Sequence, residues 1–408
     1  MRFECTHVFT ISVVLSATVF LLSAAFAVYV VLGYPVLLYL LARFRARPVR
    51  KEPLLKSVTV LLPVRNGEAW IRQKLESILE LDYPAELLQI IVISDGSTDG
   101  TEAAVREYAA RGVELVAIPP SGKALALNEG MRRARGEILF FTDVRQKLDP
   151  AALRNLVACF ADPTVGVATG ELFILRGETL EEANVGLYWR YEKCIRKCQS
   201  RVDSILGATG CIYAMRASLA GPLPAGTILD DVNLPLRAFF QGYRIVLEEG
   251  ARAYDYPTSL KSEFRRKVRT LAGVYQTIGD YPALLGPRNR MWFHFVSHKL
   301  GRLLLPWALL AAFVSSFGLP DMWRAAALSA QAGALALALL DTILPDSFAL
   351  KRITSPVRTA IALMAAAFLA AFSLLLPRGS LWQPTRVNVR GKTFTQAQPM
   401  PTREESGP

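Results

Sequence analysis

The sequence predicts an α/β domain combined with membrane-spanning helices, and three observations carry this prediction. Between residues 57 and 143, short β-branched runs alternate with amphipathic helical runs, which is the pattern of βαβ units. Residues 8–42 contain no charged side chain, and three more apolar runs follow late in the chain. Of the 408 residues, 52% are hydrophobic and the mean hydropathy is positive, which is unusual for a soluble protein.

Four strands and three helices are predicted in the first part of the α/β domain. The strands occupy residues 57–63, 88–94, 113–118 and 137–142, and the helices occupy residues 66–79, 123–133 and a segment that begins near Thr101. This alternation indicates a mainly parallel sheet, in which ligands bind beyond the carboxyl ends of the strands. The polar residues Asn66, Asp95, Asp99 and Asp143 gather at those ends.

Asp95 and Asp143 each follow an apolar strand directly. Either one alone is explained as well by a turn or a helix cap as by ligand binding. Two such acids at strand ends, with Lys123 between them in the sequence, favour a polar nucleotide pocket. Carboxylates accept hydrogen bonds from a base and a ribose, or hold a divalent cation that neutralises a diphosphate.

The first apolar stretch, residues 8–42, is a predicted membrane anchor. As a helix that rises ~1.5 Å per residue, it exceeds a hydrocarbon core of ~30 Å. A signal peptide is the alternative, but this apolar core is too long and no small-x-small cleavage site follows it. The later apolar runs are residues 303–320, 325–340 and 359–377. The middle run reaches full length only if Asp341 is included, so it is the weakest of the three.

Basic residues determine the predicted orientation. Only Arg2 precedes the first stretch, whereas six basic residues follow it: Arg43, Arg45, Arg47, Arg50, Lys51 and Lys56. The positive-inside rule therefore predicts a multi-pass protein of the inner membrane whose α/β domain is cytoplasmic. Three full C-terminal crossings would leave the basic tail outside. Because this count and the rule disagree, we expect one run, the one with Asp341, to be re-entrant or interfacial.

The net charge and the cysteine and histidine content limit the chemistry. Much of the net charge of +12 lies in the membrane flanks, and no basic motif interleaved with aromatic residues indicates nucleic-acid binding. Five cysteines suit a reducing compartment, and the pair Cys194 and Cys198 lacks the second Cys or His pair that a zinc site needs. His7, His294 and His298 lie beside or inside apolar segments, which leaves the α/β domain without a histidine general base.

We expect five regions: an anchor at residues 1–42, the α/β domain at 43–260, amphipathic interfacial helices at 261–300, membrane segments at 301–377 and a disordered tail at 378–408. A long helix over residues 177–199 places Trp189 on one face with Glu192 and Arg196. The indole of Trp189 either stacks on an acceptor sugar or packs at the edge of the core. Residues 261–279 combine an apolar stripe with basic side chains, which is typical of an interfacial helix.

Six motifs, in order, resemble family 2 glycosyltransferases of the GT-A fold. They are PVRNGE at residues 63–68, ISDGSTDGT at 93–101, GKALALNEG at 122–130, FTD at 141–143, LGATGCIYAMR at 206–216 and LDDVNLPLR at 229–237. A single motif is weak, but the set is specific and covers roughly residues 57–269. The run SHKLGRLLLP at 297–306 and its flanking apolar segments resemble the membrane synthase branch, which includes hyaluronan, cellulose and poly-N-acetylglucosamine synthases.

The resemblance implies a set of donor-binding residues. Pro63 and Asn66 stand in the first motif, Asp95 would bind the uracil of a UDP-sugar, and Lys123 would lie on the donor. A rigid GT-A domain of this kind binds the nucleotide sugar at the carboxyl ends of its strands.

The DxD and QxxRW motifs of the family are both incomplete. Asp143 matches the first acid of DxD, which contacts the donor and Mg²⁺ or Mn²⁺, but Arg145 replaces the second acid. The metal site therefore rests on one carboxylate, and Arg145 either contacts the diphosphate or is solvated. Of QxxRW only Arg269 remains, and it can stabilise the departing diphosphate. Thr270 replaces the tryptophan.

Asp231 is the predicted general base, with Asp230 beside it in the family's paired-acid position. One carboxylate must take the proton of the acceptor hydroxyl as that oxygen attacks the anomeric carbon, and paired acids raise the pKa of one member. A pair of helix N-cap residues is the alternative. Gly207, Thr209 and Gly210 resemble the loop that borders the acceptor in the family.

The predicted function is inverting transfer of a sugar, GlcNAc or glucose, from a UDP-sugar to a glycan or glycolipid acceptor at the inner membrane face. The alternatives are a processive exopolysaccharide synthase and a degenerate, non-catalytic partner of one. The predicted partners are the UDP-sugar, a glycan or lipid-linked acceptor, the lipid bilayer and either a second copy or a partner subunit, and no nucleic acid. We expect one or a few sugars to be added, because Thr270 cannot offer the stacking surface of a tryptophan.

Overall fold

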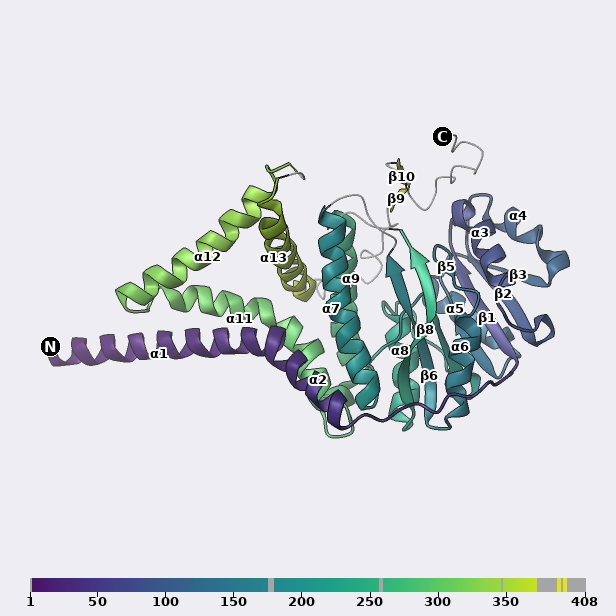
Figure 1. Cartoon of the computed structure of the whole chain (residues 1–408), viewed down its shortest axis with the longest axis horizontal. Helices are drawn as coiled ribbons and strands as arrows, with labels where there is room; N and C mark the ends of the chain where they lie inside the picture. The colour runs from purple at the N-terminus through teal and green to yellow at the C-terminus, as the bar shows by residue number, and fades with distance from the viewer. Residues whose placement is uncertain are drawn as a thin grey trace.

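A mixed β-sheet flanked by helices forms one end of the molecule, and long apolar helices form the other (Figure 1). The computed structural model describes the backbone of residues 2–174, 180–256, 260–345, 348–372, 387–389 and 392–394. Two long helices, α7 (Leu180–Val202) and α9 (Leu260–Asp280), lie between the sheet and the apolar helices (Figure 1).

The sheet has eight strands in the order β3-β2-β1-β4-β7-β6-β8-β5. Their bounds are β1 Val58–Val64, β2 Leu88–Asp95, β3 Val113–Ile118, β4 Ile138–Phe141, β5 Lys147–Leu148, β6 Val165–Ile174, β7 Tyr213–Arg216 and β8 Arg244–Asp255. The first four strands are parallel, as the βαβ alternation predicts. The expectation of a mainly parallel sheet fails in the second half, because β7 is antiparallel to both β4 and β6.

Shorter helices cover both faces of the sheet. They are α3 Glu68–Leu79, α4 Thr101–Arg106, α5 Lys123–Arg133, α6 Ala152–Ala158 and α8 Asp230–Phe240. Val60 and Leu62 of β1 pack in the core beneath α3 and α6, while Leu61 packs in the core beneath α5 and α8. A strand buried on both faces explains why residues 58–62 are almost entirely apolar. The helix predicted from Asn66 begins two residues later, because Asn66 has a φ of 50°, outside the helical region.

Four stretches are long and apolar enough to cross a membrane: Ser12–Phe44, Trp292–Ser316, Asp321–Asp341 and Lys351–Phe372. The first joins α1 (Arg2–Val28), a π-helical turn η1 (Tyr29–Gly33) and α2 (Tyr34–Phe44). The others are α10 (Trp292–His294) with η7 (Phe295–Leu300) and α11 (Gly301–Ser316), then α12 (Asp321–Asp341) and α13 (Lys351–Phe372).

The apolar helices are not a uniform bundle. α1 lies beside α11, and α12 leads away from both of them to α13 (Figure 1). α13 then returns toward the α/β domain and packs against α9 and α7, with Ala367 and Ala370 against Leu271 of α9. Asp341 is fully buried and accepts hydrogen bonds from Thr354 Oγ1 and Arg358 Nη1 of α13, at 2.7 and 3.3 Å.

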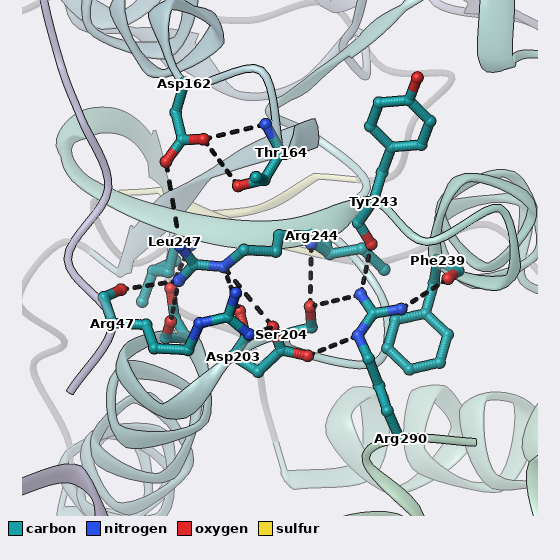
Figure 2. A network of polar contacts seen from close by, with 12 residues as sticks. Arg47, Asp162, Thr164, Asp203, Ser204, Phe239, Tyr243, Arg244, Leu247 and Arg290 are labelled. Atoms are coloured by element: carbon teal, nitrogen blue, oxygen red, sulfur yellow. Dashed lines mark hydrogen bonds and ion pairs between the residues drawn. The ribbon is translucent and has the colours of Figure 1, made fainter. Parts of the chain in front are cut away.

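A buried carboxylate, Asp203, connects the chain that leaves α2 to the sheet and to the segment before α10. Its oxygens lie 3.0 Å from Arg47 Nη1 and 2.6 Å from Arg290 Nε, and Arg244 Nε of β8 lies 3.7 Å away. Arg290 also donates to the carbonyls of Phe239 and Tyr243 (Figure 2). Because Asp203 is only 6% exposed, these three arginines make it the junction between the membrane segments and the α/β domain.

Of residues 378–408, for which we expect disorder, the structure describes only the short antiparallel pair β9 (Val387–Val389) and β10 (Lys392–Phe394). The rest of that expectation lies outside the described residues. α9 begins at Leu260, and the division into an α/β domain and interfacial helices near that residue stays a prediction.

Candidate active site

An ammonium group and two carboxylates meet beyond the carboxyl ends of the parallel strands. Lys123 begins α5, and its Nζ lies 3.0 Å from Asp143 Oδ1 and 3.1 Å from Asp230 Oδ2. Asp143 follows β4 and Asp230 begins α8, so three separate elements supply these charges. Burial alone would lower the pKa of Lys123, but Asp143, Asp230 and Asp231 raise it well above its ordinary value. Lys123 is therefore a charged ammonium at neutral pH.

Asp231 lies next to this group. Burial and the neighbouring charge of Asp230 raise the pKa of Asp231 to about 6, although Lys123 and Arg196 act in the opposite direction. A carboxylate with this pKa is ionised at neutral pH and still basic enough to accept a proton. The two acids of the pair also differ in their contacts, because Asp230 Oδ2 lies 3.1 Å from Lys123 Nζ while Asp231 lies against the loop of residues 207–210.

The loop of residues 207–210 packs against the Asp231 side of α8. Gly210 leaves room for the carboxylate, since a Cβ there would lie 2.9 Å from Asp231 Oδ2. Gly207 has a φ of +125°, a conformation that favours glycine, and the next amide, Ala208 N, donates to the Asp231 carbonyl at 2.6 Å. Thr209 Oγ1 donates to the Gly170 carbonyl at 2.9 Å. The structure therefore brings the predicted acceptor loop together with the predicted base.

The other predicted donor residues organise the loops around this site. Asp95 is buried and accepts from the backbone amides of Ser121, at 2.6 Å, and Gly122, at 3.0 Å. These bonds hold the turn that immediately precedes Lys123. Asn66 Oδ1 accepts from Thr98 N at 2.8 Å, which ties the loop after β1 to the loop after β2. Pro63 is the penultimate residue of β1, partly buried beside β2.

Arg145 has a partner that the sequence did not indicate. Its Nε and Nη2 donate to the two oxygens of Asp255, at 2.9 and 2.6 Å, and Gln146 Nε2 donates to the same carboxylate at 2.8 Å. Asp255 ends β8 and is only 3% exposed. The sequence predicts that Arg145 either contacts the diphosphate or is solvated. Instead, both oxygens of Asp255 accept hydrogen bonds from its guanidinium. A planar guanidinium fits a buried carboxylate in just this way, so Arg145 joins β8 to the loop after β4.

Arg269 of α9 faces the acids from the membrane side. It interacts electrostatically with Asp231, Asp143 and Asp230, and burial together with Arg266 lowers its pKa. Its Nε is buried and has no hydrogen-bond partner among the described residues. An unsatisfied buried donor costs about 1–3 kcal/mol, so this guanidinium is suited to an anionic ligand.

Two residues in the described part of the chain extend this site beyond the sequence prediction. The Tyr213 ring stacks on Phe141, with centroids 4.5 Å apart, and its buried hydroxyl has no partner among the described residues. Arg196 of α7 interacts electrostatically with Asp231. In the sequence, only the position of Arg196 on the same helical face as Glu192 could have indicated this role. Trp189 lies on α7, but its side chain is outside the described residues.

The site offers few ligands to a divalent cation. Among the described residues, no group of three or more His, Cys, Asp or Glu side chains is placed to hold a metal ion. Asp143 is an accessible carboxylate, with 39% of its side chain exposed. Because Mg²⁺ is often held by one or two carboxylates together with substrate phosphates, Asp143 fits such a cation only in the presence of a diphosphate ligand.

The sequence around this site is similar to that of known glycosyltransferases. Residues 59–220 match the model of glycosyl transferase family 2. These residues form a family 2 glycosyltransferase domain. The chain is similar to the β-monoglucosyldiacylglycerol synthase of Synechocystis, with 24% identity over 65% of this chain. It is also similar to the poly-β-1,6-N-acetyl-D-glucosamine synthase of Staphylococcus epidermidis, with 24% identity over 57% of this chain. The chain spans 60% of the length of each of these curated relatives.

The fold of the family 2 domain is GT-A, as the motifs predict. The solved structure of the mannosyltransferase PcManGT from Pyrobaculum calidifontis, in complex with GDP-Man and Mn²⁺, superposes with a TM-score of 0.68 at 24% identity. The similarity covers 88% of this chain and 99% of that structure, so it extends well beyond the family 2 domain into the apolar helices.

Proposed function

We propose that the chain is an inverting glycosyltransferase that transfers a sugar from a UDP-sugar to a glycan or glycolipid acceptor at the inner face of a membrane. The observation that carries this proposal is the position of Asp231. A carboxylate with a pKa of about 6 lies beside a charged Lys123 and faces Arg269, on the side of the sheet where nucleotides bind.

In this mechanism the chain's own cations hold the diphosphate of the donor. Lys123 Nζ is positioned by Asp143 and Asp230, and Arg269 offers an Nε donor that no described residue satisfies. As the bond between the sugar and the diphosphate breaks, negative charge grows on the departing oxygen, and fixed cations stabilise it. A divalent cation held by Asp143 would neutralise the diphosphate further.

Asp231 acts as the general base. The acceptor hydroxyl oxygen attacks the anomeric carbon from the face opposite the departing diphosphate, and its proton passes to the Asp231 carboxylate. Gly210 is compatible with this role, because a Cβ there would lie 2.9 Å from Asp231 Oδ2 and crowd the carboxylate. Asp230 and Asp95 are positioning residues in this mechanism, since their contacts orient Lys123 and its loop.

The sugar is proposed from the relatives. One is named a monoglucosyldiacylglycerol synthase and another an N-acetylglucosamine polymer synthase, so glucose and GlcNAc are the first donors to test. The assay is hydrolysis and transfer by the purified full chain with UDP-glucose, UDP-GlcNAc, UDP-galactose and GDP-mannose. Turnover of a UDP-sugar supports the proposal, GDP-mannose turnover alone would refute the uridine donor, and no turnover with any donor favours a non-catalytic partner.

We also propose that α13 is the interfacial segment, in place of the run with Asp341. α13 packs against α9 and α7, whereas the most apolar window of α12 is entirely unburied and suits lipid. With α1, α11 and α12 as the crossings, the α/β domain and the basic tail lie on the same, cytoplasmic side. This arrangement removes the disagreement between the number of crossings and the positive-inside rule.

A further inference from the structure

Two cations lie near Asp231 on elements that face the membrane helices. Arg196 belongs to α7 and Lys299 to η7, and each interacts electrostatically with Asp231 and Glu192. Arg196 also interacts with Glu171, which lies 3.5 Å from both Lys193 and Lys197. Lys299 also interacts with Arg196, so the two cations share one region. Both side chains are half-buried.

Neither cation is neutralised within the described part of the chain. No described carboxylate lies within 4 Å of Arg196 or Lys299, and the hydrogen bond from Arg196 Nη2 to the Gly207 carbonyl is long, at 3.5 Å. Glu192 already pairs with Arg302 and lies 3.5 Å from His298 Nε2. Two half-buried cations without a close counter-charge are costly in a folded protein, so Arg196 and Lys299 are suited to an anionic ligand.

This pair is separate from the cations proposed for the donor. Arg269 interacts with Asp143 and Asp230 as well as Asp231, which places it on the donor side. The acids that interact with Lys299 are Glu192 and Asp231. Arg196 and Lys299 therefore form a second group of cations that acts on Asp231, apart from Lys123 and Arg269.

The position of Lys299 indicates where the second anion comes from. Lys299 lies in the first two turns of the apolar stretch Trp292–Ser316, close to Trp292, which is 45% exposed. Exposed tryptophans and lysines at the start of a membrane helix lie at the level of lipid headgroups. Residues Phe295–Leu300 form a π-helix, a rare conformation that occurs frequently at functional sites.

We propose that Arg196 and Lys299 bind the phosphate group of a membrane lipid that is the acceptor of the transferred sugar. This inference rests on the proposed function, because it concerns the acceptor side of Asp231. The phosphate is shared by phosphoglycerolipids and isoprenoid phosphates, and paired Arg and Lys side chains at a headgroup boundary recognise either. In a phosphoglycerolipid a headgroup hydroxyl attacks the anomeric carbon and gives its proton to Asp231, whereas in an isoprenoid phosphate an ionised phosphate oxygen attacks and no proton passes to Asp231. A neutral glycolipid or diacylglycerol offers nothing for these two cations to bind.

The test uses the full chain in mixed micelles of a polyoxyethylene detergent, which contains no phosphate. Phosphatidylglycerol, a long isoprenoid phosphate, diacylglycerol, glucosyldiacylglycerol and soluble glycerol 3-phosphate are compared as acceptors with labelled donor. Transfer to either phosphate-bearing lipid, and inhibition by inorganic phosphate that is competitive with the lipid, support the proposal. Equal transfer to a neutral lipid, or to glycerol 3-phosphate, overturns it.

Arg196→Gln and Lys299→Gln should each raise the KM for the lipid roughly tenfold, the loss expected for one charge-assisted contact. In Lys299→Gln, the KM for the donor and the slow hydrolysis of donor without acceptor should stay within about twofold, whereas Lys299→Arg should keep lipid use near the wild-type level. Arg265→Gln is the matched control, because Arg265 is exposed on α9 and carries the same charge. An equal effect of Arg265→Gln means general attraction to the membrane and refutes the site. If the wild-type protein does not hydrolyse any donor, that result refutes the proposed function and not the lipid site alone.

Discussion

Replacing Asp231 by asparagine should abolish transfer and at the same time stabilise the protein. The pKa of Asp231 rises from 3.8 to about 6 on folding, a difference of about two pKa units. At ~1.4 kcal/mol per unit, keeping this carboxylate ionised in the folded state costs about 3 kcal/mol at neutral pH. Asparagine keeps the shape but removes the charge, so up to that amount is recovered.

The sign of the pH dependence follows from the same shift. Between pH 3.8 and about 6 the folded state binds more protons at Asp231 than the unfolded state, so its contribution to stability falls as the pH rises through this window. The gain in Tm from Asp231→Asn should therefore be several degrees above pH 6, at about 2–4 °C per kcal/mol, and should disappear near pH 4. The wild-type kcat/KM should rise with pH up to about 6 and then level off.

The assays are thermal unfolding of the detergent-solubilised chain by intrinsic fluorescence and transfer with labelled donor. Asp231→Asn should lower transfer by about 10²–10⁴-fold and leave UDP binding within a few-fold. Asp230→Asn is the matched control, because it removes a carboxylate 3.1 Å from Lys123 Nζ and should not raise Tm. Near-normal turnover of Asp231→Asn, or a Tm that falls as much as in the Asp230 variant, would show that Asp231 is a helix N-cap residue and not a general base whose ionised form is destabilised by burial.

Four further results are expected. An excess of chelator should abolish transfer and Mg²⁺ or Mn²⁺ should restore it, whereas full activity in chelator would mean that Lys123 and Arg269 neutralise the diphosphate unaided. Asp203→Ala should lower the free energy of unfolding by about 3–5 kcal/mol, because three arginines lose their shared carboxylate. Denaturant unfolding measures this change, and an unchanged denaturant midpoint would show that Asp203 does not stabilise the contact between the membrane segments and the α/β domain. Products should carry one or a few sugars by gel filtration, since Thr270 Oγ1 is bonded to its own helix, and high-molecular-weight polymer from the first turnovers would contradict this. A cysteine introduced at Ser406 should not react with an impermeant thiol reagent in intact cells, because the proposed topology keeps the tail in the cytoplasm, and the exposed Cys194 should be protected in the same way. Labelling at residue 406 without labelling at Cys194 would show that α13 crosses the membrane.

Much of the local structure was predictable from the sequence. The strand at residues 113–118 and the helix at 123–133 have the predicted bounds, because alternating and helical periodicity are properties of neighbouring residues. The same holds for acids placed directly after strands and for charge-free stretches long enough to cross a membrane. In each case the determining interactions lie within a few residues of each other, so the sequence itself contains them.

The tertiary structure decided which distant residues meet. The sequence predicts that Arg145 either contacts the donor or is solvated, yet the side chain is held by Asp255, 110 residues later. Gly210 was predicted to border the acceptor, but only folding reveals that its missing Cβ makes room for Asp231. The antiparallel β7 and the return of α13 onto α9 are likewise set by packing between segments far apart in the chain. A periodic pattern specifies which face of an element is apolar, whereas the partner of that face depends on how all the elements fill one shared core.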